Sequence, residues 1–511
     1  MKKTMIYPVL IALCALLSPN AEAAAQSAEA VTKKSFDFII GLDGDFKKAL
    51  STASAAASSG KRFYIFFPNG EYAIGALTGD ANQMTTITTS NLSLIGENID
   101  STVISNKAKN ESISTTATLF FSKANNLYLQ DLTVLNKGNY GDPGAVNVTG
   151  RFVAIEDQGD KNVYKNVKLL SNQDTYYSKS SRTYWETGEI HGFVDFICGY
   201  GDVFFNRCLL YLENRSSVVI TAPATQTSWG YVFMDCTIDG AAGDGYRLGR
   251  SWSNQPKCVY INTVMKKIPN AAGWGDPMNV VPALFAEYNS RTASGSAVNL
   301  SGRRTTYTKD ATTVTLKPVL TEQEAAKYTV DNVLKGSDGW QPENLTKQLG
   351  APDVSVESGM LVWDDNDSAL CWMVFRDKKY FGCVTVNSCD IPPDSPKALF
   401  TVRAANAMGG LGAASDPVSG VSTPVSVLQY SARGDMYLQY NSVRRMVQLR
   451  GVPGETVRMA VYSADGRTVL SGKADVTEGA AELSIGALQP GMYVVRVRSG
   501  IMKNCSRIFV R

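Results

Sequence analysis

Asp195 is a carboxylate in the middle of an apolar segment, between Phe193-Val194 and Phe196-Ile197. Burying a charge among apolar neighbours is costly unless the charge is paired, so this aspartate needs a partner. Asp174 precedes it by 21 residues, about one coil of a solenoid built from strands. Neighbouring parallel strands lie ~4.8 Å apart, so the two carboxylates could face each other across adjacent coils.

Two adjacent carboxyl groups cannot both ionise cheaply, so their proton affinities separate. One carboxylate and one carboxylic acid then supply a nucleophile and a proton donor without histidine. His191 is the only histidine of the chain, which excludes a multi-histidine metal site. No Gly-x-Ser-x-Gly segment occurs, so we do not expect a serine esterase, and we interpret His191 as structural or peripheral.

Three more polar or aromatic residues belong to this hypothesis. Gln173 stands beside Asp174, Arg250 could pair with the aspartate that stays ionised, and Trp252 offers a flat face for a sugar ring. Each residue alone has a structural explanation, because solenoid aspartates often bond backbone amides and Arg or Trp side chains often pack. The functional hypothesis therefore depends on their joint occurrence.

Short strands, not helices, must position these residues. Segments in which one polar residue precedes alternating apolar positions begin at Asp131, Asn166, Arg207, Asp235 and Asn262. Recurrence at about one coil length is typical of a solenoid, in which stacking supplies a core that no coil can bury alone. We therefore predict a right-handed parallel β-helix, since a β-sandwich would need turn signals every ~8–12 residues.

Two helical segments flank the predicted solenoid. Residues 45–59 are rich in good helix formers and would cap its open end, where a sheet edge is otherwise exposed. Residues 321–335 predict another helix, with Thr321 and Glu324 spaced as a capping box.

The 511 residues are enough for about three domains, and the fold class that we predict is all-β, a parallel β-helix followed by two small β-sandwiches. Residues 354–415 resemble a fibronectin type III-like module. The predicted divisions are a signal peptide at 1–23, the β-helix at 34–350, the fibronectin type III-like sandwich with its linker at 351–426, and a C-terminal sandwich at 427–511.

Export is indicated by the first residues. Lys2 and Lys3 precede a 13-residue stretch that is mostly apolar and too short to span a bilayer, and Ala21-Glu22-Ala23 fits a cleavage site. We expect no transmembrane segment. The net charge of +3 provides no extended cationic face, so we expect no nucleic-acid partner.

Cysteine spacing gives no zinc pattern, because no paired Cys-x-x-Cys occurs. Most of the eight cysteines beyond the signal peptide are expected to be small buried apolar residues. In an exported chain the most plausible local bridge joins Cys383 to Cys389.

Three blocks of the sequence resemble the signature blocks of pectin methylesterases. They are NQDTYY at 172–177, GFVDFICG at 192–199 and LGRSW at 248–252, and the match extends from about residue 36 to 342. The resemblance implies a metal-independent parallel β-helix that works with an aspartate pair and no cofactor. It also implies hydrolysis of the C6 methyl esters of homogalacturonan, the backbone of pectin, with release of methanol and de-esterified pectate.

The resemblance also assigns roles. Asp195 corresponds to the nucleophile, and Asp174 to the general acid that later acts as base. Gln173 corresponds to an oxyanion donor, and Arg250 to the residue that orients the nucleophile. The implied substrate-binding residues are Trp252, Arg151, Tyr177 and Trp274.

Three positions depart from the family pattern. Arg151 replaces a glutamine that donates to the oxyanion; the guanidinium could serve the oxyanion, bind a substrate carboxylate or pair with an aspartate. Cys198 replaces a phenylalanine and removes an aromatic ring from the cleft. Ser251 replaces a proline, which should loosen the local backbone.

Residues 462–467 and 488–497 resemble the C-terminal sorting domain of type IX secretion cargo. The resemblance implies the type IX secretion machinery as a partner, and a location outside a Bacteroidetes-type cell or on its outer-membrane surface. We expect a monomer that acts on methyl-esterified homogalacturonan.

Two other functions stay open. One is another pectin-active enzyme on the same fold, a lyase or a polygalacturonase. The sequence offers no convincing acidic cluster for the calcium of a pectate lyase, and Ile190 replaces the first glycine of a polygalacturonase Gly-His-Gly block. The other is a non-catalytic pectin-binding or surface protein.

Overall fold

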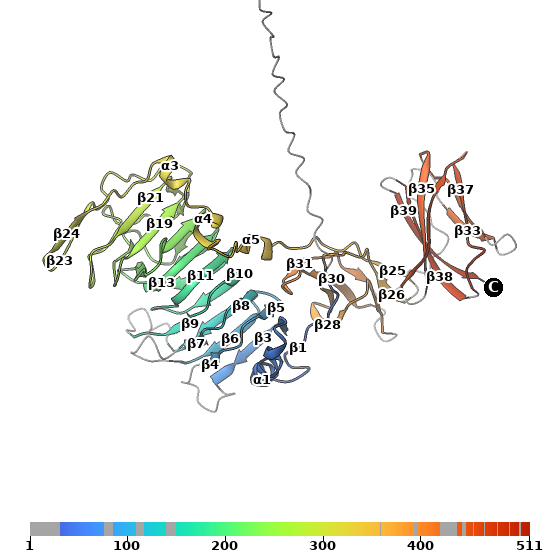
Figure 1. The fold of residues 1–511 in the computed structure, drawn as a ribbon, viewed down its shortest axis with the longest axis horizontal. Helices are drawn as coiled ribbons and strands as arrows, with labels where there is room; N and C mark the ends of the chain where they lie inside the picture. Colours follow the sequence, from blue (N-terminus) through green and yellow to red (C-terminus); the bar gives the residue numbers. More distant parts are fainter. Residues whose placement is uncertain are drawn as a thin grey trace, which may run out of the picture.

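The computed structural model describes residues 31–75, 85–108, 117–138, 140, 150–357, 359–392, 397–419, 437–441, 446–452, 454–463, 466–477, 479–489, 491–499 and 502–510. The predicted signal peptide and residues 420–426 of the predicted linker lie outside these ranges. The chain forms a parallel β-helix, drawn from blue to yellow-green in Figure 1, followed by two sets of antiparallel sheets. The predicted all-β fold class is confirmed.

Three parallel faces make up the β-helix, and we name them sheets I, II and III. Sheet I contains β1 (Phe38–Ile39), β2 (Phe63–Phe67), β5 (Leu92–Gly96), the first half of β8 (Tyr128–Asn136), the first half of β10 (Asn162–Leu170), the second halves of β11 and β13, β16 (Tyr231–Met234), β19 (Lys257–Ile261) and β21 (Leu284–Tyr288). Sheet II contains β3 (Gly70–Ala73), β6 (Thr102–Asn106), the second halves of β8 and β10, β12 (Glu189–Gly192), β14 (Leu209–Leu212), β17 (Thr237–Gly240), β20 (Val264–Met265) and β22 (Arg291–Thr292).

Sheet III is the face that carries the candidate site. Its strands are β4 (Thr85–Ile87), β7 (Ala117–Phe121), β9 (Val153–Asp157), the first half of β11 (Tyr176–Glu186), the first half of β13 (Val194–Asn206), β15 (Val219–Pro223) and β18 (Arg247–Gly249). The long strands β11 and β13 run from sheet III into sheet I, and the register between them shifts between Lys179 and Arg182.

The polar residue that starts each recurring segment makes the turn from sheet I to sheet II. All five predicted starts have left-handed backbone, with φ between 50° and 56°, a conformation that Asn and Asp adopt more readily than other non-glycine residues. Asn262 donates from Nδ2 to Asp235 Oδ1 at 3.0 Å, and Asn289 donates to Asn262 Oδ1 at 2.8 Å. A ladder of side-chain hydrogen bonds therefore connects successive coils at this corner.

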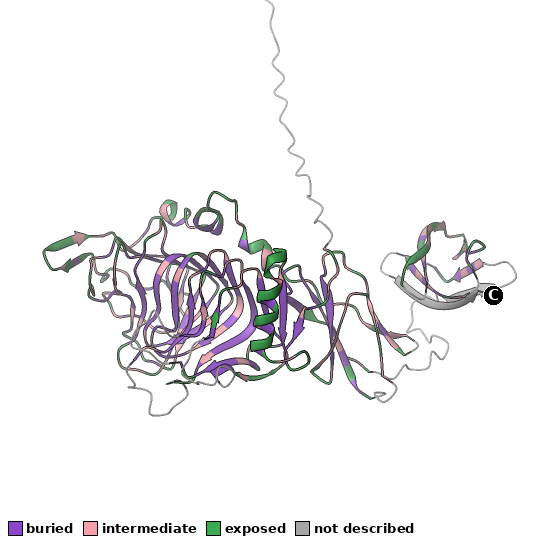
Figure 2. Ribbon diagram, turned by 60° about the horizontal axis from the view of Figure 1, so that its bottom comes forward, coloured by how far each residue is buried: buried purple, intermediate pink, exposed green. Residues whose placement is uncertain are grey.

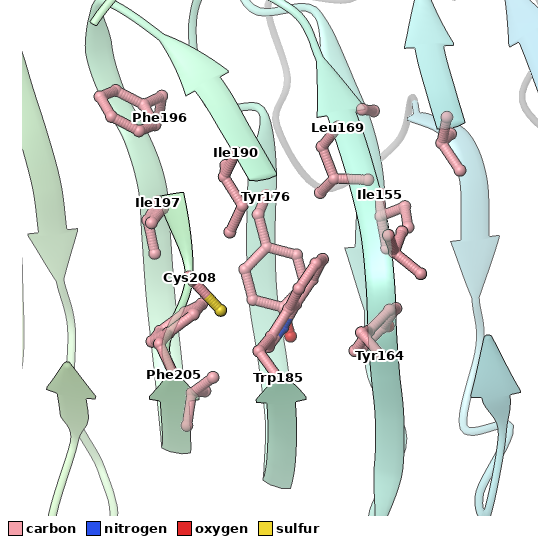
Figure 3. Packing of buried hydrophobic residues seen from close by; sticks show 14 of the residues in the cluster. Ile155, Tyr164, Leu169, Tyr176, Trp185, Ile190, Phe196, Ile197, Phe205 and Cys208 are labelled. Carbon is pink, nitrogen blue, oxygen red and sulfur yellow. The ribbon is translucent and has the colours of Figure 1, made fainter. Parts of the chain in front are cut away.

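Aromatic rings stack along the interior of the β-helix. Trp185 lies parallel to Tyr164 with ring centroids 4.2 Å apart, and Phe233 stacks between Phe205 and Tyr260 at 4.5 Å on each side. Figure 3 shows Phe205, Trp185 and Tyr164 side by side on successive coils. Each coil thus supplies part of a core that becomes continuous only when the coils stack.

A helix covers the N-terminal end of the β-helix, as predicted. α1 (Phe46–Ala56) is capped by Asp45, whose side chain accepts from the Lys48 N–H, and a short 3₁₀ turn, η1 (Ala57–Ser59), follows. Phe46 is buried in the same cluster as the first interior residues and packs on Phe67. The helix thereby removes apolar surface from water where no earlier coil can cover it.

The outer face of sheet I is covered by protein. Its outward residues, such as Tyr128, Val163 and Val232, form one buried cluster with two later parts of the chain. One part is the segment with α3 (Glu322–Ala325), α4 (Val330–Leu334) and α5 (Pro342–Leu345). The other is the middle β domain, through Met373 and Leu411. Figure 2 shows the strands largely buried and exposed residues in turns and in the hairpin β23 (Thr306–Lys309) and β24 (Thr312–Thr315).

The middle β domain has two antiparallel sheets over a core that includes Trp363 and Trp372. One sheet contains β25 (Ser355–Glu357), β26 (Met360–Val362) and β29 (Ser388–Asp390). The other contains β27 (Cys371–Arg376), β28 (Lys379–Val384), β30 (Leu399–Ala405), β31 (Leu411–Ala414) and β32 (Val418–Ser419). Its likeness to fibronectin type III stays a prediction.

The C-terminal domain also has two antiparallel sheets. They contain β33 (Tyr437–Asn441), β34 (Met446–Arg450) and β37 (Ala480–Ser484), and β35 (Thr456–Ser463), β36 (Thr468–Asp475), β38 (Gly491–Ser499) and β39 (Met502–Val510). Val447, Val461 and Val495 belong to the buried cluster between them.

Two sequence-based predictions need correction. The helix expected at 321–335 is two short helices, because Thr329 caps a new helix by accepting from the Asn332 N–H; the Thr321–Glu324 capping box is present. The Cys383–Cys389 bridge is wrong: both thiols are free, and the two residues lie on different sheets, β28 and β29. The Cys383 thiol contacts that of Cys371 instead.

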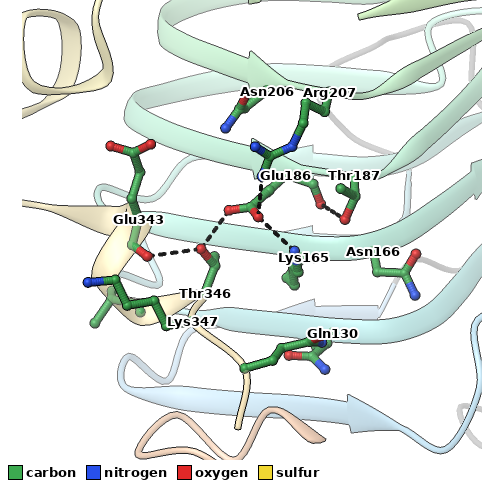
Figure 4. A network of polar contacts seen from close by, with 12 residues as sticks. Gln130, Lys165, Asn166, Glu186, Thr187, Asn206, Arg207, Glu343, Thr346 and Lys347 are labelled. Atoms are coloured by element: carbon green, nitrogen blue, oxygen red, sulfur yellow. Dashed lines mark hydrogen bonds and ion pairs between the residues drawn. The ribbon is translucent and has the colours of Figure 1, made fainter. Parts of the chain in front are cut away.

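A polar network fastens α5 to the outer face of sheet I (Figure 4). Glu186 accepts from Lys165 Nζ and Arg207 Nη2 at 2.7 Å each, and from the Thr346 hydroxyl at 2.6 Å, directly after α5. Burial raises the pKa of Glu186, but the hydrogen bonds from Lys165 and Thr346 outweigh burial and hold that pKa below its usual value. The carboxylate is therefore the charged centre of this attachment.

We expect Glu186→Gln to lower the free energy of unfolding by about 3 kcal/mol at pH 7, because it leaves a buried lysine without its charge partner. A lowered folded-state pKa stabilises the fold above the unfolded-state pKa of about 4.3, and this stabilisation is lost as pH falls through the folded-state value. Urea titrations at several pH values should therefore show the two proteins converging below about pH 4. Asp331→Asn, in the exposed pair with Lys335, is the control and should change stability by less than about 0.5 kcal/mol.

Candidate active site

Asp174 and Asp195 stand on adjacent coils of sheet III, as predicted. Gln173 pairs with Val194 across the two strands, and the Asp174 N–H donates to the Val194 carbonyl at 3.2 Å. Both aspartates have left-handed backbone, with φ of 56° and 48°. This conformation costs most residues roughly 1–2 kcal/mol, which Asp and Asn bear best.

Arg250 holds one aspartate of the pair. It directly follows β18, and its backbone N–H donates to the Thr221 carbonyl on β15. Its Nε donates to Asp195 Oδ1 at 2.9 Å and its Nη2 to Oδ2 at 2.5 Å. Such a two-point contact fixes both the position and the plane of a carboxylate. Asp195 is therefore oriented by the arginine that the sequence analysis assigned to it.

The two carboxyl groups have different electrostatic surroundings. Burial, and then the negative charge of Asp195, raise the pKa of Asp174 to about 7. Burial also raises the pKa of Asp195, but the hydrogen bonds and charge of Arg250 oppose this. The arginine favours the ionised form of Asp195, so Asp195 ionises first and Asp174 keeps its proton to higher pH.

Four other predicted residues lie on the same face of the β-helix. Arg151 Nε lies 3.5 Å from Asp174 Oδ2, and the Gln173 side chain hydrogen-bonds the same carboxyl group. Trp252 is half-buried and lies over Tyr177, with ring centroids 6.0 Å apart. Tyr177 is itself only 4% exposed, so it supports Trp252 from below more than it meets solvent.

Trp274 does not lie in this groove. It is 1% exposed and stacks on Phe285 in the interior of the β-helix, with ring centroids 4.2 Å apart. A ring without a free face cannot bind a sugar, so the predicted substrate contact of Trp274 is corrected to a core contact. His191 is also structural: it stacks on Tyr211, and its Nδ1 lies 2.9 Å from Glu213 Oε1.

Cys198 has a role that the sequence analysis did not foresee. It occupies the outward row of sheet III beside Tyr177 and Ala222, and its thiol lies close enough to the Asp174 carboxyl group to influence its pKa. Burial and the nearby aspartates raise the pKa of this thiol, so it stays neutral. The departure from the family's phenylalanine thus adds a polar contact to the general-acid candidate.

Three charged or aromatic residues on the same face were missed. Lys179 follows Tyr177 at the alternating position, lies with its ammonium over the Tyr177 ring, and pairs with Glu156 Oε1 at 3.4 Å. Tyr200 is the strand partner of Lys179 on β13. The period-two alternation after Tyr177 was the signal that could have placed Lys179 here.

No group of three or more His, Cys, Asp or Glu side chains within the described ranges could hold a metal ion. Within those ranges, no helix is long and apolar enough to cross a membrane.

Comparison with known proteins matches two parts of the chain. The family model described as Pectinesterase matches residues 41–337, and the one described as Secretion system C-terminal sorting domain matches residues 440–511. Relatives include pectinesterase 2 of Citrus sinensis, 26% identical over 60% of this chain and 59% of its own length. Pectinesterase 1 of Olea europaea is 32% identical over 32% of this chain and 44% of its own length.

The chain spans between 22% and 59% of the length of seven curated relatives that it matches. Among solved structures, the pectin methylesterase PemA from Erwinia chrysanthemi is 26% identical and covers 60% of this chain and 99% of its own, with a TM-score of 0.47. Because the first model matches more than half of the sequence and includes all three signature blocks, this chain belongs to the pectinesterase family.

Proposed function

We propose that this protein hydrolyses the C6 methyl esters of pectin, releasing methanol and de-esterified pectate. The observation that carries the proposal is the unequal aspartate pair. Arg250 binds Asp195 through two hydrogen bonds, while Asp174 on the adjacent coil has a pKa raised to about 7 and so keeps its proton below that pH. One group is thus prepared as a nucleophile and the other as an acid. Membership of the pectinesterase family supports the same chemistry.

In the first step, an Asp195 oxygen adds to the C6 carbonyl carbon of a galacturonate methyl ester. The bond from C6 to the methoxy oxygen breaks, and that oxygen takes the proton of Asp174 and leaves as methanol. Asp195 and the sugar are then joined as a mixed anhydride. Gln173, half-exposed beside Asp174, would donate to the oxyanion that forms on the carbonyl oxygen.

In the second step, a water oxygen adds to the same carbon and gives one proton to the Asp174 carboxylate. The bond from C6 to Asp195 breaks, which restores the Asp195 carboxylate beside Arg250 and leaves Asp174 protonated. The product acid loses its remaining proton to solvent. No metal or cofactor takes part in either step.

Trp252 would bind the polymer next to the reacting ester, supported from below by Tyr177. We expect Trp252→Ala to raise KM for esterified pectin by about tenfold, the loss of about 1.4 kcal/mol of ring contact, with little change in kcat. Steady-state methanol release measures both constants, and Trp252→Phe should keep most of the affinity. A fall in kcat without a change in KM would contradict a binding role.

Export by the type IX secretion machinery is part of the proposal, supported by the C-terminal sorting domain at residues 440–511. The mature enzyme would then act outside a Bacteroidetes-type cell or on its surface, as a monomer. The domain boundaries that we propose for the chain are those predicted from the sequence, with a signal peptide at 1–23.

Methanol release from highly esterified pectin tests the function directly. We expect methanol together with new carboxylates, and no unsaturated or reducing chain ends. New unsaturated ends would instead indicate a lyase, and new reducing ends a polygalacturonase. Binding without any product would indicate a non-catalytic surface protein.

A further inference from the structure

Arg151 meets the general-acid candidate from the solvent side. It lies just before β9, and its Nε is 3.5 Å from Asp174 Oδ2. The guanidinium side chain is 40% exposed, whereas that of Asp174 is 7% exposed, so the arginine covers a carboxyl group that the fold has otherwise enclosed. The sequence left three uses for Arg151 open, and the contact supports the pairing with an aspartate.

The other groups that face Asp174 come from neighbouring strands. Asp195 faces it from the next coil, the Cys198 thiol lies close to it, and Gln173 precedes it in the chain. The second arginine of the site, Arg250, is committed to Asp195 through both Nε and Nη2. Arg151 is therefore the cation whose charge acts on Asp174 by direct ion-pair contact.

We propose that Arg151 is a positioning residue: it holds the Asp174 carboxyl group at the mouth of the site and sets the pH at which general-acid catalysis is lost. The proposal rests on the hydrolysis proposed above. It replaces the direct substrate contact that the sequence analysis assigned to Arg151. A glutamine, as the family has here, could donate a hydrogen bond but could not supply this charge.

The sign of the effect follows from the charge. Burial and Asp195 raise the pKa of Asp174, and Arg151 opposes them because a cation favours the carboxylate. Asp174 must be protonated to release methanol, so activity falls on the alkaline side as this proton is lost. Removing the Arg151 charge should therefore move the alkaline limb of the pH profile of kcat/KM to higher pH.

We expect Arg151→Gln to move the alkaline limb of kcat/KM upward by about one pH unit, a modest shift because the guanidinium is partly screened by solvent. Arg151→Lys keeps the charge and should restore most of the wild-type limb. Lys179→Gln is the matched control: it removes a cation from the same face that pairs with Glu156, and should leave the limb in place.

A readout without catalysis separates this inference from the function itself. Carboxyl ¹³C NMR of aspartate-labelled protein can follow the titration of Asp174, whose resonance is identified by its disappearance in Asp174→Asn. In Arg151→Gln, the pH midpoint of this titration should rise by the same amount as the alkaline limb. A wild type that releases no methanol would overturn the proposed hydrolysis. An active Arg151→Gln enzyme with an unmoved limb, or with only a raised KM for pectin, would overturn the role of Arg151.

Discussion

Asp195→Asn should reduce kcat for methanol release from esterified pectin by about 10⁴-fold or more, because it removes the proposed nucleophile. Asparagine is the sharpest substitution here. It matches the shape of aspartate and tolerates the left-handed backbone at φ 48°, whereas alanine would add strain. The variant therefore separates loss of chemistry from loss of fold.

Asp235→Asn is the matched control for this experiment. Asp235 has the same left-handed backbone, at φ 53°, but lies on an exposed corner of the β-helix. An asparagine there can still accept the hydrogen bond from Asn262, so activity and circular dichroism should match the wild type. An Asp195→Asn protein that releases methanol at more than about a hundredth of the wild-type rate would contradict the assigned nucleophile.

Asp174→Asn should reduce kcat by about 10³-fold, the usual contribution of a positioned general acid and base. The size of the loss should depend on the leaving group. Methanol needs a proton as it departs, whereas nitrophenolate leaves without one. With a nitrophenyl ester of galacturonate, the first step should therefore survive in this variant while the second step, which needs a base, stays slow.

Stopped-flow absorbance can distinguish the two steps. We expect Asp174→Asn to release about one nitrophenolate per active site rapidly and then turn over slowly, the pattern of an accumulating covalent intermediate. Asp195→Asn should give no such burst. An equal loss of rate with the methyl ester and the nitrophenyl ester in Asp174→Asn, without a burst, would show that Asp174 does not act as the acid of the first step.

The β-helix was predictable because its corner residues repeat. The polar starts of the recurring segments proved to be the left-handed residues between sheets I and II. One coil escaped detection: Thr187, also left-handed, lies between Asn166 and Arg207, and its segment does not resemble the others. The spacing between Asn166 and Arg207 is about twice one coil because a complete coil lies between them. Lys168 pairs with Glu189, and Glu189 pairs with Leu209.

The site was only partly predictable. An aspartate within an apolar run, with another about one coil earlier, was enough to place the pair on neighbouring strands. The partner of Arg151 could not be inferred, because a guanidinium can bind an oxyanion, a substrate carboxylate or an aspartate equally well. Trp274 was misplaced because an indole in a core and one in a groove look alike along the chain. The Ser251 hydroxyl donates to the Val280 carbonyl, a contact that no sequence pattern indicated.

The covered outer face of sheet I has a consequence for how this protein could evolve. Outward residues such as Tyr64, Phe66 and Tyr128 share one apolar interface with Met373 and Leu411 of the middle domain. A catalytic unit truncated after residue 350 would expose this apolar face to water and become prone to aggregation. We therefore expect the middle domain to be retained wherever the catalytic unit occurs, because exchanging it would expose this apolar face.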